Sequence, residues 1–305
     1  MARRCVYAAA MTLLLLVSCV DYQVARNLEK ETWVQPARDQ GLDVLWVLDN
    51  SASMYEEQEQ LAAHTQAFAD GLSRVDVDLR LGVLSTDAEM EQLPVWISGS
   101  AEVLASEFSF AILNQGLGSR EERGFDAALW AASDLRSGVD AELLFFSDED
   151  DQSDVGAQTL VDEYSGRTGA LGINAIVGDP PQGCASLVAA ADPAPIYLQA
   201  VELTQGSRDS ICALDYDSML SRMALHVLGL EDRFALAELP ELSSMEVLLD
   251  EDQVPQDPEN GWSYDAGNNF LVLNGDYVPS PGQVLQARYY RWFGAWGDRR
   301  DQEAQ

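Results

Sequence analysis

A carboxylate and two hydroxyls occupy alternate positions where an apolar run ends. Asp49, Ser51 and Ser53 follow the run Val44–Leu48 directly. A buried strand that stops in this way presents three oxygen ligands to one point in space. Hard oxygen donors suit Mg²⁺ better than zinc, and Mn²⁺ and Ca²⁺ are further candidates. The segment therefore predicts a divalent-cation site at the end of a strand.

A later apolar run ends in a similar way. The run Leu143–Phe146 is followed by Ser147 and Asp148. Together, in this order, the two segments resemble the metal-ion-dependent adhesion site (MIDAS) of von Willebrand factor A domains. That family has Asp-x-Ser-x-Ser after an early strand and Thr-Asp or Ser-Asp after a later one. The resemblance covers residues 41–230.

The resemblance implies both a set of ligands and a kind of partner. Asp49, Ser51 and Ser53 would contact the metal, and Asp148 would support it directly or through water. Mg²⁺ keeps several waters in its coordination sphere, and a carboxylate from another protein can replace one of them. The expected function is therefore adhesion or protein–protein interaction through an acidic residue of a protein partner.

One part of the family pattern is missing. The family supplies a threonine from the loop before its central helix, whereas the loop at 116–124 contains none. Ser119 could donate a hydroxyl there, or Glu121 or Glu122 could bring a carboxylate. A carboxylate would raise the negative charge and favour the metal over an acidic ligand. Alternatively, the two glutamates are first-turn acids that the helix dipole favours.

Other uses of the same residues stay open. Ser51 and Ser53 could cap a helix that begins near Glu56, while Asp49 bonds to loop amides. Asp49 and Asp148 could also serve a Mg²⁺-dependent periplasmic hydrolase or phosphoesterase. A third possibility is a structural envelope scaffold in which the metal only braces the loops.

The sequence lacks the usual enzyme signatures. It has two histidines, and its one lysine, Lys30, lies outside any glycine-rich phosphate loop. The acidic run Asp148–Asp154 does not open an EF-hand, because Ser153 replaces the glycine and Thr159 the closing glutamate. Some of these acids could bind a second cation, although a solvated loop is the favoured interpretation. We therefore expect a protein that is not an enzyme.

The elements that must position the site alternate between strands and helices. Apolar runs predict buried strands, and apolar residues at steps of three and four predict helices over 56–74, 124–135 and 216–230. The pattern predicts an α/β fold, a doubly wound, mostly parallel sheet flanked by helices, over residues 41–230. Ligands of such sheets bind at the carboxyl ends of the strands. The predicted strands are Val44–Leu48, Leu79–Leu84, Leu143–Phe146 and Ile173–Val177.

The two ends of the chain have different sequence patterns from the central part. Strand-like runs separated by frequent turns predict a small, β-rich domain over 232–294, followed by a polar tail over 295–305. Residues 19–40 are polar and lack sustained periodicity, so we expect a tether.

The first residues are typical of an export signal. A basic start precedes the apolar stretch Val6–Val17, which is too short to span a bilayer. Leu16–Cys19 resembles the bacterial lipobox, which implies a signal peptide over 1–18 and lipidation of Cys19. An ordinary cleaved signal peptide is the alternative. Val20 is not the aspartate of an inner-membrane retention signal, which favours the outer membrane.

The remaining cysteines fit an exported protein. Once Cys5 leaves with the signal and Cys19 carries lipid, Cys184 and Cys212 remain as a pair. Export leads to an oxidising compartment, so we expect a disulfide between them.

The charge of the chain excludes some partners. The formal net charge is −33, from 51 acidic and 18 basic residues. Binding to nucleic acid depends on clustered lysines and arginines, so no nucleic-acid partner is expected. Anionic bilayer surfaces would repel the chain, so contact with a membrane is expected through the lipid anchor only.

Overall fold

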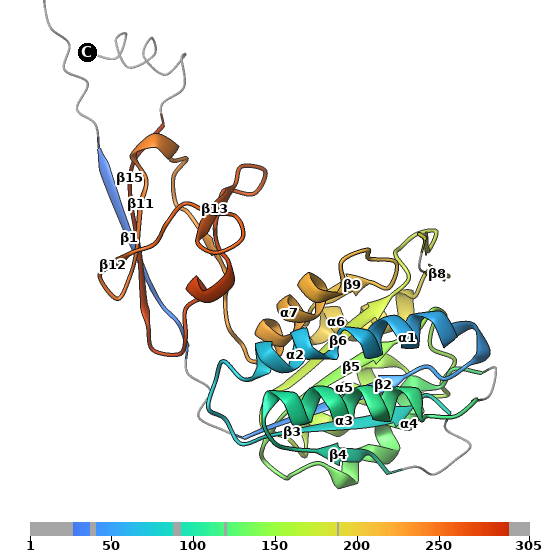
Figure 1. Cartoon of the computed structure of the whole chain (residues 1–305). Helices are drawn as coiled ribbons and strands as arrows, with labels where there is room; N and C mark the ends of the chain where they lie inside the picture. The colour runs from blue at the N-terminus through green and yellow to red at the C-terminus, as the bar shows by residue number, and fades with distance from the viewer. Residues whose placement is uncertain (1–26, 37–40, 88–92, 119–120, 188, 293–305) are drawn as a thin grey trace, which may run out of the picture.

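The computed structural model describes residues 27–36, 41–87, 93–118, 121–187 and 189–292. An α/β domain is built on a six-stranded sheet with the order β4-β3-β2-β5-β6-β9 (Figure 1). All neighbouring strands in it are parallel except the pair β3 and β4. This confirms the doubly wound, mostly parallel sheet. Its strands are β2 (Leu42–Leu48), β3 (Leu79–Ser85), β4 (Val95–Ile97), β5 (Asp140–Phe146), β6 (Leu171–Val177) and β9 (Arg208–Ser210).

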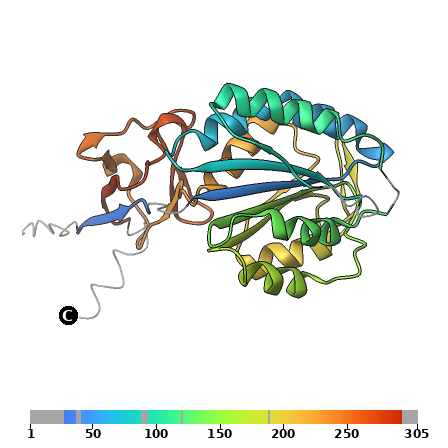
Figure 2. The ribbon, with the colours of Figure 1, turned by 90° about the horizontal axis from the view of Figure 1, so that it is seen from below.

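The central strand β2 is buried along its whole length because helices cover both faces of the sheet (Figure 2). Alternate residues pack into two separate clusters: Trp46 faces one and Val47 the other. The helices on the Trp46 face are α1 (Tyr55–Ala63), α2 (Thr65–Leu72), α3 (Ala101–Leu113) and α7 (Tyr216–Val227). Those on the Val47 face are α4 (Gly124–Ala131), α5 (Ala157–Ser165) and α6 (Pro195–Thr204).

The helix expected over 56–74 is two helices that meet at His64. The predicted stripe is still buried, with Leu61 and Phe68 fully covered. At the break, the Thr65 hydroxyl donates to the carbonyls of Ala62 (3.2 Å) and Ala105 (3.0 Å), so α2 begins with a bond to α3. Such a contact with a distant segment is not visible in local periodicity. The sequence also did not single out β4, α3, α5, α6 and β9.

The second part of the molecule is a β module of two antiparallel sheets, with orders β1-β15-β11-β12 and β10-β14-β13. The predicted β-rich segment supplies most of its strands. These are β10 (Arg233–Ala235), β11 (Glu246–Leu249), β12 (Asp252–Gln253), β13 (Trp262–Asp265), β14 (Phe270–Leu273) and β15 (Val284–Tyr290).

One strand of the module comes from the expected tether. Strand β1 (Leu28–Val34) pairs antiparallel with β15, so the expectation of an unstructured spacer is wrong for these residues. The more covered face of β1 carries charged residues, which hid its period of two. Glu31 is held there by the Tyr289 hydroxyl and by the amide of Ala237 (3.1 Å). The α/β domain is thus inserted between the first strand of the module and the rest.

The two parts share contacts and an apolar cluster. The Gln35 side-chain Nε2 donates to the carbonyls of Glu231 and Pro279, both at 2.9 Å. The Arg74 guanidinium donates to the Gly275 carbonyl at 2.9 Å. The module lies beside the amino ends of the central strands, and their carboxyl ends point away from it (Figure 1).

Short elements complete the described chain. They are the 3₁₀ turns η1 (Ala52–Met54), η2 (Ala132–Asp134), η3 (Leu242–Ser244) and η4 (Gly275–Tyr277) and the small strands β7 (Cys184–Ala185) and β8 (Ala190–Ala191). No helix among the described residues is long and apolar enough to cross a bilayer. The predicted signal peptide over 1–18, Cys19 and the tail over 295–305 lie outside the described residues.

Candidate metal centre

Two neighbouring strands bring the predicted aspartates to one edge of the sheet. Strands β2 and β5 are parallel and in register, with Leu48 opposite Phe146. The Asp49 amide continues the ladder by donating to the Phe146 carbonyl at 2.9 Å. The Ser147 hydroxyl then donates to Asp49 Oδ2 at 2.6 Å. Asp49 and Asp148 therefore leave adjacent strands side by side.

The two serines form a line between these aspartates. The Ser51 amide donates to Asp49 Oδ1 at 2.8 Å, which turns the loop back over the carboxylate. The Ser51 and Ser53 hydroxyl oxygens are 2.9 Å apart, and the Ser53 hydroxyl donates to Asp148 Oδ1 at 3.4 Å. The structure thus brings together the four residues predicted first.

The serine hydroxyls do not cap the following helix. Ser51 precedes η1 without a side-chain bond to it, and the residue before α1 is Met54. The alternative interpretation is right only for Asp49, which does accept a bond from a loop amide. The Ser53 hydroxyl therefore bonds to a carboxylate, and the Ser51 hydroxyl bonds to that of Ser53.

Of the two glutamates that could replace the missing threonine, Glu122 lies at the site. Glu122 is 1 % exposed, whereas Glu121 is exposed and Ser119 lies outside the described residues. Glu122 Oε2 accepts a bond from the Thr86 hydroxyl. Its backbone carbonyl accepts from the Gln152 amide at 2.7 Å, which fixes the loop. The structure thus places Glu122, and not Glu121, in the buried surroundings of Asp49.

Sequence reasoning missed two residues of this edge. Thr86 follows strand β3, whose last residue Ser85 is opposite Leu48 of β2. Its place after an apolar strand was a usable clue. Glu57, on the first turn of α1, is 5 % exposed. The burial of Glu57 was not predictable from the sequence, because an acid in the first turn of a helix usually faces solvent.

The carboxylates at this edge lack nearby positive charge. Burial and the charge of Asp49 raise the pKa of Glu122 to about 8 and that of Asp148 to about 7. Burial, together with Glu56 and Asp49, also raises the pKa of Glu57. A divalent cation would supply the missing charge and return these groups to their ionised forms.

Unpartnered buried atoms gather at the same edge. Among the described residues, five buried side-chain nitrogen or oxygen atoms have no hydrogen-bond partner: Asn50 Oδ1, Glu57 Oε2, Glu122 Oε1, Tyr197 Oη and Trp46 Nε1. The first three belong to this edge, and Asp49 and Glu122 lie near enough to Tyr197 to raise its pKa, after the larger effect of burial. Buried acceptors normally have partners. A hydrated cation would satisfy acceptors of this kind.

The residues fit a small, hard cation. All of the converging side chains offer oxygen, as Mg²⁺ and Ca²⁺ prefer. Within the described ranges, no three Asp, Glu, His or Cys side chains are grouped so as to hold a metal by themselves. The candidate ligand set therefore combines Asp49 and Asp148 with the hydroxyls of Ser51 and Ser53, and Glu122 lies beside it.

The acids that follow Asp148 position helices. Asp150 Oδ1 accepts from the Ile196 amide at 3.0 Å, near the start of α6. Asp151 Oδ1 accepts from the Phe125 amide at 3.1 Å, at the start of α4. These contacts explain the two acids without a second cation.

The predicted disulfide is confirmed. Cys184 and Cys212 are bonded, with Cα atoms 6.0 Å apart. The bond joins the loop after β6 to the segment before α7. The same loop reaches the site, where the Asp192 amide donates to the Asp148 carbonyl at 2.8 Å.

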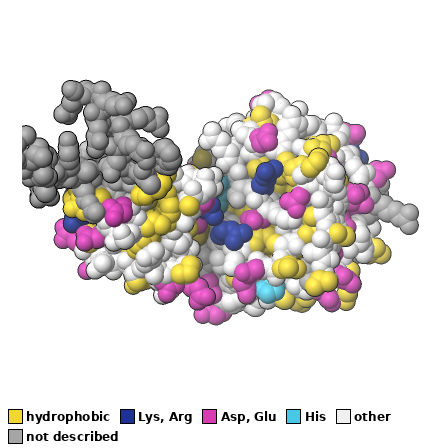
Figure 3. Space-filling view, turned by 90° about the horizontal axis from the view of Figure 1, so that it is seen from above, with side chains coloured by type: hydrophobic (Ala, Val, Ile, Leu, Met, Phe, Trp, Pro, Cys, Tyr) yellow, Lys and Arg dark blue, Asp and Glu magenta, His cyan; other side chains and the backbone are white. Residues whose placement is uncertain are grey.

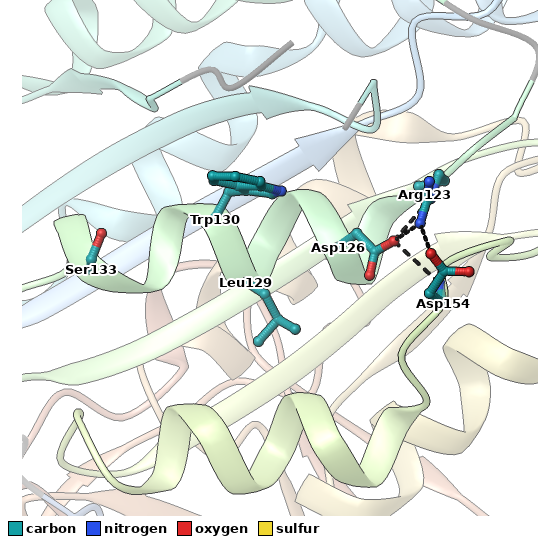
Figure 4. Close-up of a pocket in the computed structure, with 6 residues that line it drawn as sticks. All are labelled: Arg123, Asp126, Leu129, Trp130, Ser133 and Asp154. Carbon is teal, nitrogen blue, oxygen red and sulfur yellow. Dashed lines mark hydrogen bonds and ion pairs between the residues drawn. The ribbon is translucent and has the colours of Figure 1, made fainter. Parts of the chain in front are cut away.

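A groove of about 650 Å³ beside α4 contains none of the predicted site residues (Figure 4). The Arg123 guanidinium lies there between Asp126, at 2.5 Å, and Asp154. Its charge is neutralised within the groove, so it does not reach the carboxylates at the strand ends.

The comparisons with known proteins return structures only. No protein-family model matches the chain, and no curated protein matches it. The pilus adhesin SpaC from Lactobacillus rhamnosus GG is 11 % identical with a TM-score of 0.49, covering 87 % of this chain and 41 % of its own. A von Willebrand factor type A protein from Catenulispora acidiphila is 11 % identical with a TM-score of 0.42, covering 88 % and 66 %.

A third structure resembles a smaller share of the chain. The conserved hypothetical protein BatB from Bacteroides thetaiotaomicron is 12 % identical with a TM-score of 0.40, covering 61 % of this chain and 98 % of its own. The chain spans about two fifths of the adhesin and just under two thirds of the Catenulispora protein. Resemblances this distant carry no argument about function, which rests on the site itself.

Proposed function

We propose that this chain binds a divalent cation, Mg²⁺ first, at the carboxyl edge of its α/β sheet and uses it to bind an acidic group on a protein partner. The observation that carries the proposal is a line of oxygens between buried carboxylates, on which only other acids act as charged groups. Asp49 and Asp148 are 0 % and 8 % exposed, with Ser51 and Ser53 between them and Glu122 beside them.

Each side chain has a place in the proposed site. Asp49, Ser51 and Ser53 would hold the cation, and Asp148 and Glu122 would contact it directly or through water. The bound cation would supply positive charge and exchangeable water positions at the surface. Ser53 is exposed, so a partner can approach from its side.

Glu122 sets the balance between metal and partner. A threonine in its place would leave Asp49 and Asp148 to balance the two charges of the cation. Glu122 adds a third carboxylate, which strengthens the hold on the cation and weakens the attraction for an acidic group. We therefore propose tight metal binding and a weaker interaction with the partner.

A hydrolase that uses Asp49 and Asp148 has less support. The charged groups that act on the pKa of Asp148 are the carboxylates of Asp49, Glu57 and Glu149. They would repel a phosphoester, and the nearby Arg123 is paired with two aspartates. The proposal is therefore a binding protein rather than an enzyme.

The proposed location is the bacterial envelope, with lipid on Cys19 as the anchor and the outer membrane as the favoured site. The disulfide between Cys184 and Cys212 supports an oxidising compartment. Labelling with a radioactive or clickable fatty acid, followed by Cys19→Ser, tests the anchor.

Thermal unfolding in EDTA and in Mg²⁺ tests the metal site. Mg²⁺ at a hundred times its Kd should stabilise the wild-type chain by about 2.7 kcal/mol. Asp49→Asn should abolish the shift. Asp162→Asn, which changes an exposed acid on α5, should leave it intact. Absence of a shift in the wild-type chain would sink the proposal, whereas a shift that Asp162→Asn also abolishes would point to nonspecific charge.

Capture from envelope extract tests the partner. The wild-type chain should retain a protein in Mg²⁺ and release it in EDTA, and Asp49→Asn should retain none. Capture that survives EDTA would indicate the scaffold alternative, in which the metal only braces the loops.

A further inference from the structure

Three arginines from separate elements converge at the junction between the α/β domain and the β module. Arg208 comes from β9, Arg222 from α7 and Arg233 from β10. They line one cavity of about 220 Å³. Figure 3 shows basic side chains gathered where the two parts meet. We call Arg208, Arg222 and Arg233 the arginine cluster.

The lining of the cavity has more basic than acidic side chains, although the chain is strongly negative. Its titratable lining consists of Arg208, Arg222, Arg233, His226, Asp209 and Asp232. With a neutral histidine, three arginines against two aspartates leave one net positive charge. The whole chain carries −33. The fold has therefore concentrated scarce positive charge at this place.

The three guanidinium groups are incompletely neutralised. Arg222 Nη2 lies 3.1 Å from Asp209 Oδ1. Arg233 Nη1 is 3.9 Å from Asp265 Oδ2, at the limit of an ion pair. Arg208 is exposed and has no ionic partner in the described part of the chain. Guanidinium donors therefore remain for a ligand.

The surroundings limit the size of that ligand. The cavity adjoins a groove of about 1120 Å³ between the two parts, and Arg222, Asp232 and Arg233 line both. The groove also carries further acids, namely Asp70, Asp217, Glu259 and Asp276. These would repel a long polyanion, whereas a single anionic group can reach the smaller cavity.

We propose that the arginine cluster binds one oxyanion, the phosphate or carboxylate group of a small ligand. The planar guanidinium donates two parallel hydrogen bonds to such a group, and pairs of this kind are stronger than bonds between neutral groups. Arg208 and Arg222 belong to the α/β domain and Arg233 to the β module. A bound oxyanion would therefore link the two parts across their junction.

The site is independent of the proposed metal centre. The module adjoins the amino ends of the central strands, and the metal centre lies at their carboxyl ends (Figure 1). Binding of an oxyanion to the cluster should persist in EDTA and in the Asp49→Asn variant. Failure of this inference would leave the proposed metal function untouched.

Titration of the purified full chain with sodium phosphate, and separately with sodium acetate, tests the inference. The measurement is calorimetric, in EDTA at pH 7, with chloride adjusted to hold the ionic strength constant. We expect saturable binding of at least one anion. Arg208→Gln and Arg233→Gln should each weaken it about tenfold, as expected for loss of a charge-assisted pair.

The matched control is Arg167→Gln. Arg167 is exposed on the same domain and faces Glu163, outside the cluster. It should bind the anion as the wild-type chain does. Stronger binding of phosphate than of acetate would assign a phosphate ligand, and the reverse would assign a carboxylate. No saturable binding of either anion, or equal weakening by Arg167→Gln, would overturn the inference.

Discussion

Strand β2 carries a buried aspartate near each end, and the two have opposite surroundings. Asp43, near its start, is 1 % exposed and lies between the guanidinium groups of Arg80 and Arg136 at 2.7 to 2.8 Å. Asp49, just beyond its end, is 0 % exposed and its side chain bonds to Ser51 and Ser147. Burial alone is therefore common to both.

The comparison separates an acid with a structural role from an acid that we propose binds a cation. Burial alone would raise the pKa of Asp43, but Arg80 and Arg136 hold it below its ordinary value. At the other end, burial and Asp49 raise the pKa of Glu122 and Asp148. A buried carboxylate group whose countercharge the fold provides is part of the core. A buried carboxylate group for which the fold provides no countercharge could instead be neutralised by a cation from solution.

The largest expected effect comes from Asp43→Asn. Removing one partner of a buried ion pair leaves the other charges uncompensated, so the free energy of unfolding should fall by about 3 to 5 kcal/mol, with or without Mg²⁺. The matched change, Asp49→Asn, should cause no loss in EDTA because it relieves repulsion. Urea unfolding measures both. An equal loss of stability for Asp49→Asn in EDTA would contradict the distinction between the two aspartates.

The pH dependence of stability should show the second effect. A carboxyl group whose pKa is raised by folding stabilises the protein below its ordinary pKa and loses that contribution as pH rises. In EDTA, the free energy of unfolding should therefore fall between about pH 4 and pH 8 by roughly 4 kcal/mol, which corresponds to one pKa raised by about three.

Two conditions sharpen this pH test. Saturating Mg²⁺ should remove most of the fall, since the cation binds the ionised forms. Glu122→Gln should reduce the fall in EDTA, because the amide does not titrate. A fall of the same size in wild type and Glu122→Gln would show that Glu122 has no part in it.

Mg²⁺ affinity should distinguish the two neighbouring glutamates. Glu122→Gln should weaken Mg²⁺ binding about tenfold, close to 1.4 kcal/mol, through loss of a nearby negative charge. Glu121→Gln, an exposed neighbour, should leave the affinity unchanged. Calorimetric titration with MgCl₂ measures both. Glu122→Thr should also lower the affinity for Mg²⁺ and should strengthen capture of an acidic partner.

The smallest expected effect concerns Thr86. Its hydroxyl donates to Glu122 Oε2, so Thr86→Val should remove one hydrogen bond and cost about 1 kcal/mol in EDTA. Thermal unfolding checks this. A larger loss in Mg²⁺ than in EDTA would mean that Thr86 also serves the cation.

Much of the α/β framework was predictable because its cues are local. Four apolar runs gave the central strands, and buried stripes at helical spacing gave three helical regions. The break at His64 was not predictable, since it depends on a bond from Thr65 to α3. Strand β1 was missed because its charged Glu31 is satisfied by β15, far along the chain.

The candidate site divides in the same way. The type and order of Asp49, Ser51, Ser53 and Asp148 pointed to one edge of a parallel sheet. The choice between Glu121 and Glu122 stayed open, because the path of the loop decides which of two adjacent side chains is buried. In the structure Glu122 is the buried one.

The sequence by itself determined where the strands end and which oxygen-bearing side chains follow them. Both depend on the local order of apolar and polar residues. Only the tertiary structure decided which carboxylates are buried with a countercharge and which without one. It placed Arg80 and Arg136 beside Asp43 but put Glu122 beside Asp49. Such pairings join residues that are far apart in the chain, and the low dielectric of the interior makes them decisive.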